Sequence, residues 1–330
     1  MTPRRICLVT GATGFVGSAL LRRLEGVSAL HVKALVRDQG ARLPEGVTPV
    51  LAAGDQALQQ ALPLDDVDVV VHCAARAHIM RDVAEEPLAE FRKVNAEGTI
   101  SLAQQAAQAG VRRFVFLSSI KVNGESTPVA EPFRPNDLPA PQDAYGQSKQ
   151  EAEEGLGAIM RDKGMEVVIV RPPLVYGPGV KANFARLMRL VELGLPLPLA
   201  SVDNRRSLVG LDNLVDMLIQ CIHAPNVAGK TLLVSDGQDL STPDLIRLIA
   251  RAMNKKPRLL PVPPRALHLL GRMLGKQDEV ERLCGSLCVD ISETKRLLGW
   301  TPPHSPEEQI RRTVDHYLKQ HAATAEQTRS

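Results

Sequence analysis

The feature that most constrains this chain is a glycine-rich turn directly after a short apolar run. Residues 6–9 are apolar, residues 11–17 read Gly-Ala-Thr-Gly-Phe-Val-Gly, and residues 18–24 have the spacing of a helix. Glycines let the main chain turn tightly and approach a pyrophosphate, and a helix N-terminus offers free N–H groups to phosphate. The pattern therefore predicts a dinucleotide site rather than a purely structural turn. The expected cofactor contacts here are Gly11, Thr13, Gly14, Phe15, Val16 and Gly17.

The first half of the chain continues to alternate strands with helices. Further strands are predicted at residues 31–36, 47–52, 67–73, 113–117 and 167–170, and helices at residues 57–62, 87–109 and 145–163. Continuous apolar strands that alternate with helices indicate a parallel sheet covered on both faces. The predicted fold class is α/β, a Rossmann-type doubly wound parallel sheet with a smaller C-terminal substrate-binding domain.

The sequence pattern changes after residue 171, where prolines cluster and shorter amphipathic segments replace the alternating strands and helices. These segments are residues 184–193, 213–223, 242–253 and 264–274. We assign residues 1–171 to the dinucleotide-binding domain, which a strand near residues 231–234 would complete. Residues 172–320 then form mainly the substrate domain, and residues 321–330, which are small and polar, form a flexible tail.

Composition excludes several classes of protein. The 330 residues carry 40 Lys+Arg against 37 Asp+Glu and only 3% aromatic residues, which argues against a nucleic-acid partner. Cys284 and Cys288 lack a second Cys or His pair, so no metal site is predicted. No stretch approaches the roughly 20 apolar residues of a membrane span. We therefore expect a cytoplasmic protein with reduced cysteines.

The end of the second strand indicates which cofactor is bound. An acid at this point binds the adenosine ribose of NAD, whereas an arginine accommodates the 2′-phosphate of NADP. Arg37 occupies the strand end and Asp38 follows it, so NADP(H) is favoured and NAD(H) remains possible. Further cofactor contacts are predicted at Asp55, after the third strand, and at Ala74 and Ala75, after the fourth.

A tyrosine and a lysine lie one helical turn apart at positions 145 and 149. A phenol with a pKa of about 10 is a poor acid–base group at neutral pH. A neighbouring ammonium and an oxidised nicotinamide would lower that pKa, and Lys149 can also donate to the nicotinamide ribose. Ser119 ends the predicted fifth strand, where its hydroxyl can bind a reacting carbonyl. Without Ser119 and the glycine turn, Tyr145 and Lys149 would be read as a surface pair.

With these motifs the chain resembles the extended short-chain dehydrogenase/reductase family, in the NAD-dependent epimerase/dehydratase branch related to UDP-glucose 4-epimerase. The resemblance covers nearly the whole chain and rests on residues 10–17, 73–75, 95–99, 118–119, 145–149, 171–179, 206–212 and 297–300. It implies that Ser119, Tyr145 and Lys149 form the catalytic triad. It also implies that Pro172 and Val175 lie beside the nicotinamide.

The resemblance further implies a substrate and a partner. The substrate would be a hexose attached to UDP, which reacts at C4. The implied substrate contacts are Ser119, Lys121, Asn183, Arg206 and Arg76, with Arg206 at the family's diphosphate-binding position. Related proteins form homodimers through the helices predicted here at residues 87–109 and 145–163, so a homodimer is expected.

Three reactions are compatible with this family. A 4,6-dehydratase is excluded because Ile120 and Lys121 stand where its acid pair belongs. Arg37 favours a reductase of UDP-4-keto-6-deoxy-N-acetylhexosamine in surface-polysaccharide (O-antigen) precursor synthesis. The alternative is a UDP-hexose or UDP-N-acetylhexosamine 4-epimerase with tightly bound NAD. An alternative of another class is a non-catalytic NADP-sensing regulator, which the intact triad disfavours. A reductase of small aldehydes or ketones is disfavoured by Arg206.

Overall fold

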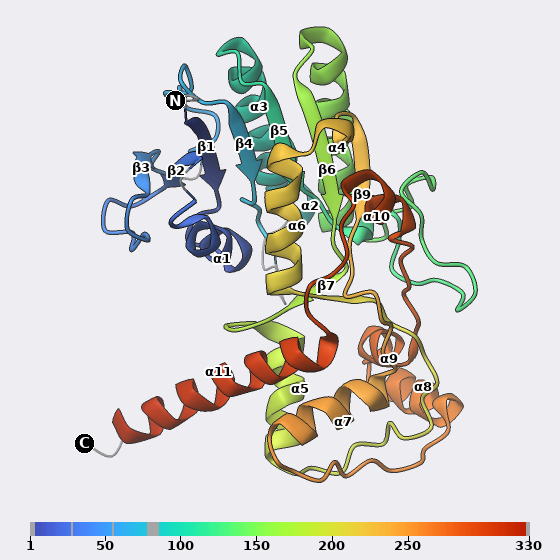
Figure 1. Ribbon diagram of the computed structural model, residues 1–330. Coiled ribbons are helices and arrows are strands. Elements are labelled where there is room, and N and C mark those ends of the chain that lie inside the picture. The colour runs from blue at the N-terminus through green and yellow to red at the C-terminus, as the bar shows by residue number, and fades with distance from the viewer. Residues whose placement is uncertain (1–3, 28, 55, 78–85, 328–330) are drawn as a thin grey trace.

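The computed structural model describes residues 4–27, 29–54, 56–77 and 86–327 (Figure 1). One parallel sheet has the strand order β3-β2-β1-β4-β5-β6-β9. Its strands are β1 (Arg5–Thr10), β2 (Leu30–Val36), β3 (Thr48–Leu51), β4 (Val69–His72), β5 (Arg113–Leu117), β6 (Glu166–Arg171) and β9 (Lys230–Leu233). This is the predicted Rossmann-type sheet. The strand order reverses between β1 and β4, which is the point where such sheets bind ligands.

Helices cover both faces of the sheet because successive strand residues point to opposite sides. Helices α1 (Phe15–Leu24) and α6 (Leu211–His223) pack on the face that receives Cys7 and Val9 of β1. Helices α3 (Gly98–Gln108) and α4 (Ala144–Lys163) pack on the face that receives Leu8. Both faces are thus buried, and the polar groups of a ligand site are left to the strand ends.

Two predicted helices differ from what the structure contains. Residues 56–60 form turns instead of the helix expected at residues 57–62. Pro63 disfavours helical backbone at Leu62, whose N–H donates to Oε1 of Gln105 at 3.0 Å. The helix expected at residues 87–109 is divided into α2 (Pro87–Phe91), the π-helical η1 (Arg92–Glu97) and α3.

A second, smaller layer lies below the carboxyl ends of the strands in Figure 1. It contains the parallel pair β7 (Leu174–Tyr176) and β8 (Leu208–Gly210). Its helices include α5 (Ala182–Glu192), α7 (Thr242–Ala252), α8 (Pro264–Met273), α9 (Gln277–Cys284) and α11 (Pro306–Gln327). A separate core of Tyr176, Phe184, Ile246 and Val314 joins β7, α5, α7 and α11. Short elements η2 (Ile120–Val122), η3 (Pro225–Val227) and α10 (Ser292–Leu298) complete the described chain.

Helix α11 differs from the expectation of a flexible tail from residue 321, because the backbone stays helical to Gln327. The alanine, glutamate and glutamine of this stretch all favour helix. Its end projects from the body of the molecule in Figure 1. None of the described helices is long and apolar enough to cross a membrane.

Candidate active site

The glycine turn brings β1, β4 and α1 into close contact. Gly11 has φ +64°, and a Cβ there would lie 2.7 Å from the backbone N of Ala74. A Cβ on Gly17 would lie 2.1 Å from the Gly11 carbonyl oxygen. Gly14 donates its N–H to the Gly11 carbonyl at 2.9 Å and occupies the N-cap of α1. Side chains at positions 11 and 17 would therefore fill the turn, which only glycine leaves open.

This turn fits the diphosphate of a dinucleotide. The first turn of α1 carries no acidic side chain, so no carboxylate within that turn neutralises the positive end of the helix. Thr13 and Gly14 are exposed at the helix start, while Phe15 and Val16 are half-buried. An anion can therefore reach the N–H groups at the start of α1.

A buried histidine at the end of β4 connects the glycine turn to η1. Nδ1 of His72 lies 2.6 Å from Oγ1 of Thr10, and Nε2 lies 2.9 Å from Oγ1 of Thr99. The Thr99 hydroxyl donates to the Asn95 carbonyl at 2.7 Å. Burial, together with the charge of Lys149, lowers the pKa of His72 to about 3. The ring is therefore neutral and serves to hold the surrounding elements in place.

Asn95, in the π-helical segment, ties the end of β4 to α4. Its Nδ2 donates to Oγ of Ser148 at 3.0 Å and to the Arg76 carbonyl at 3.1 Å. Its Oδ1 accepts from the Arg76 N–H at 2.8 Å. Ser148 in turn donates to the Tyr145 carbonyl at 2.8 Å. The first turn of α4, which carries Tyr145, is thus fixed relative to the glycine turn.

The structure brings the three predicted catalytic side chains together. Ser119 follows β5 and is nearly buried, while Tyr145 and Lys149 lie in the first two turns of α4. The Lys149 ammonium donates to the Leu117 carbonyl at 2.9 Å and lies 4.4 Å from the centre of the Phe116 ring. The end of β5 therefore positions both Ser119 and the lysine.

The electrostatics of this cluster differ from the sequence-based expectation. Burial raises the pKa of Tyr145 to about 12, and the Asp143 carboxylate adds to the rise, whereas a hydrogen bond with Ser119 opposes it. Burial lowers the pKa of Lys149 to about 8. The causes of the Tyr145 shift do not include the Lys149 ammonium, which was expected to lower the pKa of the phenol. The protein groups alone keep Tyr145 protonated.

Lys121, which was predicted to contact the substrate, is paired with two carboxylates. Its ammonium binds Asp143 and, at 2.7 Å, Glu125. Asp143 caps α4 by accepting the Gly146 N–H at 2.7 Å. In this arrangement Lys121 supports the start of the helix that carries Tyr145.

A buried ionic network lies beneath Ser119. The guanidinium of Arg171 contacts the Glu153 carboxylate at 2.5 Å, and its Nη1 donates to Oδ1 of Asn123 at 2.9 Å. The Ser118 hydroxyl donates to Glu153 at 2.5 Å. Because these residues come from β6, α4, η2 and the end of β5, the network fixes the four elements that surround the triad.

No motif singled out three of these supporting residues. Asp143 had a usable signal, because an aspartate shortly before a helical segment is a common N-cap. His72 directly precedes the small residues 73–75, which marked the strand end but not the ring's partners. Glu153 carries no local signal, because its partner Arg171 is 18 residues away in the chain.

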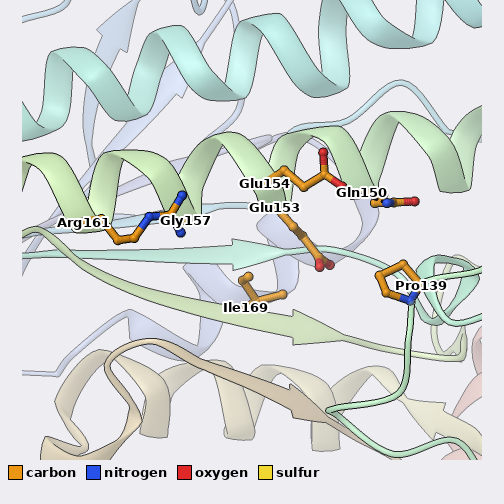
Figure 2. Close-up of a pocket in the computed structure, with 7 residues that line it drawn as sticks. All are labelled: Pro139, Gln150, Glu153, Glu154, Gly157, Arg161 and Ile169. Atoms are coloured by element: carbon orange, nitrogen blue, oxygen red, sulfur yellow. Dashed lines mark hydrogen bonds between the residues drawn. The ribbon is translucent and has the colours of Figure 1, made fainter.

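A pocket of about 320 Å³ lies on the other side of this network and is separate from the triad. Figure 2 shows Glu153 pointing from α4 toward Ile169 of β6, with Pro139 at one end of the pocket and Arg161 at the other. Its lining includes none of Ser119, Tyr145 or Lys149. We therefore place the candidate site at the triad and not in this pocket.

The predicted substrate arginine lies in the smaller layer. Nη1 of Arg206 donates to the carbonyls of Arg282 and Gly285, at 2.9 and 3.1 Å, at the carboxyl end of α9. Burial lowers its pKa, and the neighbouring Arg282 charge contributes. Asn183 is exposed in the first turn of α5, directly after Ala182, whose φ is +54°.

The other predicted contacts are spread around the strand ends. Arg37 is exposed after β2. The Arg76 guanidinium lies 3.8 Å from Glu90 and 5.8 Å from the centre of the Phe91 ring.

Ala74 and Ala75 follow β4, and Val175 lies in β7. The Pro172 carbonyl accepts the Ile120 N–H at 2.9 Å, which brings Pro172 close to Ser119. Asp55 lies outside the described residues. Within the part of the chain that the structure describes, no group of three His, Cys, Asp or Glu side chains is placed to hold a metal ion.

Known proteins are similar to this chain in sequence and in fold. The model of the NAD dependent epimerase/dehydratase family matches residues 7–234. The chain is 50% identical to a UDP-glucose 4-epimerase of Vibrio cholerae over 94% of this chain and 95% of that protein. It is 25% identical to the N-acetyl-α-D-glucosaminyl-diphospho-ditrans,octacis-undecaprenol 4-epimerase of Escherichia coli O157:H7, over 94% of both chains. The crystal structure of Bacillus cereus UDP-glucuronic acid 4-epimerase in complex with NAD has the same fold. That structure has a TM-score of 0.76 and 20% identity, over 95% of this chain and 99% of that one.

Proposed function

The chain belongs to the NAD-dependent epimerase/dehydratase family, and on that premise we propose that it is a UDP-hexose 4-epimerase that retains NAD. The observation that carries the proposal is the convergence of Ser119, Tyr145 and Lys149 at the end of β5, which pairs with β4, the strand whose end contacts the glycine turn. The Vibrio cholerae and Escherichia coli relatives, both 4-epimerases by name, support epimerisation over the reduction expected from Arg37.

The residues around the glycine turn would hold the dinucleotide. Residues 11–17 would bind its diphosphate, Arg37 and Ala74 its adenosine side, and Pro172 and Val175 its nicotinamide side. When bound, NAD supplies a positive charge beside Tyr145 and exchanges a hydride with C4 of the hexose.

Tyr145 is the proposed acid–base group. Its phenolate would take the proton of the C4 hydroxyl as C4 is oxidised, and would return it to the oxygen when the 4-keto sugar is reduced on its other face. The burial that raises the pKa of Tyr145 to about 12 keeps the proton on the phenol until positive charge is added nearby. Proton transfer is thereby coupled to cofactor binding.

The other triad members and Arg206 would position the sugar. The Ser119 hydroxyl would bind the C4 oxygen, and Lys149 would donate to the cofactor ribose while it holds the Leu117 carbonyl. Arg206 would bind the UDP diphosphate, with Asn183 beside the nucleotide. In this proposal Lys121 and Arg76 support α4 and η1 instead of touching the sugar.

The proposal extends to the organisation of the molecule. Residues 1–171 together with β9 would hold the dinucleotide, and residues 172–320 mainly the UDP-sugar. We also propose a cytoplasmic homodimer that pairs α3 and α4 with the same helices of a second copy, and a product used for surface polysaccharide. Analytical ultracentrifugation tests the dimer, and a monomer over the whole concentration range would contradict it.

The experiment that tests the function needs no added cofactor. The purified protein is denatured, and the released nucleotide is identified by chromatography and mass spectrometry. The native protein is given UDP-glucose alone, and UDP-galactose is followed by NMR. We expect close to one NAD per chain and conversion without added nucleotide. An empty protein that leaves UDP-glucose and UDP-N-acetylglucosamine unchanged would contradict the epimerase.

The second candidate is the 4-reductase that uses NADPH, and Arg37 favours it. This guanidinium is exposed at the end of β2, where a 2′-phosphate would lie. A reductase would be inactive on UDP-glucose and would oxidise added NADPH with a UDP-4-keto-6-deoxy-N-acetylhexosamine. Arg37→Asp would then raise the dissociation constant of NADPH sharply. An unchanged constant would remove the argument from Arg37.

A further inference from the structure

Helix α8 turns apolar side chains away from the protein. Within it only Leu267 and Gly271 are buried. At 100° per residue, Leu269 lies on the opposite side of the helix from these two. The exposed fractions in this segment are 61% for Leu269, 51% for Leu270, 76% for Met273 and 69% for Leu274, which directly follows the helix. We call these four residues the α8 apolar face.

Single exposed leucines are common on protein surfaces, but a contiguous cluster is not. The α8 apolar face groups four of the large hydrophobic residues that are at least half exposed, within one and a half turns of chain. A soluble protein gains nothing from holding these side chains in water. The cluster is therefore typical of a surface that binds an apolar partner.

The charges around this face are almost all positive. The chain carries no acidic residue between Asp244 and Asp278. In the same interval the basic residues that flank α8 or lie on it are Lys255, Lys256, Arg258, Arg265, Arg272 and Lys276. Arg265 and Arg272 are exposed seven residues apart, alongside Leu269.

Helix α9, which packs against α8, carries acidic side chains. Asp278, Glu279 and Glu281 lie there, and Glu279 is 3.9 Å from Lys276 and 3.8 Å from Arg186. Among the described residues, these acidic side chains form no ion pair with Arg265 or Arg272.

We propose that the α8 apolar face docks on the surface of a bilayer that contains anionic phospholipids. A helix bound in this way buries its apolar side chains at the boundary of the acyl region, while flanking basic residues reach the headgroups. The basic flank selects an anionic surface over a neutral one, because the whole chain has a net charge of only +3 and this segment is far more positive. Docking of this kind needs no membrane-spanning helix.

The position of α8 relates the proposed membrane-binding surface to the proposed substrate site. In Figure 1 it lies at the outer edge of the smaller layer, away from the sheet. It packs against α9, whose carboxyl end holds Arg206 through the carbonyls of Arg282 and Gly285. Docking would therefore place the proposed diphosphate-binding side close to the bilayer. The inference goes beyond the proposed function, and vesicle binding tests it without any turnover.

The test is flotation of the full-length protein with vesicles. One set consists of phosphatidylcholine alone, and the other contains one third phosphatidylglycerol. We expect the protein to float with the anionic vesicles at low salt, to remain behind with the neutral ones, and to dissociate from the anionic ones at high salt.

Two double variants separate the apolar from the electrostatic contribution. Leu269→Gln with Met273→Gln should abolish flotation at any salt concentration. Arg265→Gln with Arg272→Gln should weaken binding to anionic vesicles by about 25-fold, since each basic residue near such a surface contributes about fivefold. The matched controls are Leu138→Gln, which changes an 88% exposed leucine elsewhere, and Arg22→Gln with Arg23→Gln on α1. All of these positions are exposed, so melting temperatures should stay unchanged.

Several results would overturn the proposal. The proposal would be wrong if the protein floated with neither kind of vesicle, or floated equally well with neutral and anionic vesicles. It would also be wrong if the control variants lost flotation as much as the α8 variants do. Self-association without lipid that the Leu269→Gln and Met273→Gln changes abolish would identify a second copy of the chain as the occupant, and would also reject the membrane.

Discussion

The two layers of the molecule hold their polar groups in different ways. Around the sheet, His72, Asn95, Glu153 and Arg171 are buried, and each is hydrogen-bonded to a neighbouring element. In the smaller layer, Arg206 is partly exposed and is held by main-chain carbonyls. The groups that support the proposed triad are thus fixed inside the protein, whereas Arg206, which would meet the substrate, lies partly at the surface. Substitution of these buried groups around the sheet should therefore be costly, whereas substitution of exposed charged groups in the smaller layer should be tolerated.

The largest effect is expected where the proposed chemistry itself is removed. Tyr145→Phe should lower turnover by about 10²–10⁴-fold, because the phenol oxygen carries the proton. Bound nucleotide should be retained, since the change leaves the glycine turn intact. Tyr317→Phe in the smaller layer, which loses a hydrogen bond to Glu192, is the control and should keep full turnover. Equal activity of the Tyr145→Phe variant would refute the acid–base assignment.

The two layers can be compared by the free energy of unfolding that is lost when one partner of an ion pair is removed from each. Glu153→Gln leaves the Arg171 guanidinium uncompensated and should lower the free energy of unfolding by about 3–5 kcal/mol in urea titrations. Glu307→Gln breaks the exposed contact with Arg251 in the smaller layer and should cost less than about 1 kcal/mol. Similar losses in the two variants would erase the difference between the layers.

The proposed substrate arginine should affect the binding of the UDP-sugar. Arg206→Ala should raise KM for the UDP-sugar by about 10–100-fold, the loss expected for hydrogen bonds to a charged group. Its neighbour Arg205 is exposed, and Arg205→Ala provides the matched control. Steady-state kinetics with both variants measure the difference. An unchanged KM in the Arg206→Ala protein would exclude this residue from the diphosphate site.

A pH dependence of stability is expected from the sheet layer. Because burial holds the pKa of His72 near 3 and that of an unfolded histidine is 6.5, acid favours the unfolded chain between these values. This contribution to stability is fully present above pH 6.5 and should fall by about 1.4 kcal/mol for each pH unit until the pH reaches the folded pKa of about 3. In His72→Gln this part of the slope should vanish. Parallel unfolding curves for the two proteins between about pH 7 and pH 5 would contradict a buried neutral ring.

The sheet layer could largely be predicted from sequence because local signals agree there. Residues 113–117 are the observed β5, and the helix expected at residues 145–163 begins one residue earlier and ends at Gly164 in left-handed conformation. The π-helical turn around Asn95 could not be predicted, because it depends on contacts with α4 and not on local propensity. The direction of the Tyr145 pKa shift likewise depends on burial and on the nearby Asp143 carboxylate.

The smaller layer was harder to predict because its elements are short and pair over long distances. Strands β7 and β8 have three residues each and lie more than 30 residues apart. Helix α9 has eight residues, none of them buried, and its apolar residues Val280, Leu283 and Cys284 are too few to mark a helix in the sequence. Proline clusters located the layer, but they did not indicate that the carbonyls after α9 would hold Arg206.

The attachment of Arg206 to carbonyls has a consequence for how such a site can diversify. A carbonyl belongs to every residue type, so side-chain replacements at position 282 leave that acceptor in place. Position 285 is different, because a Cβ on Gly285 would lie 2.7 Å from the Glu281 carbonyl oxygen and would shift the bend. Changes at Gly285 or in the length of this bend, and not replacements at Arg282, are the route by which such a scaffold would acquire a different diphosphate ligand.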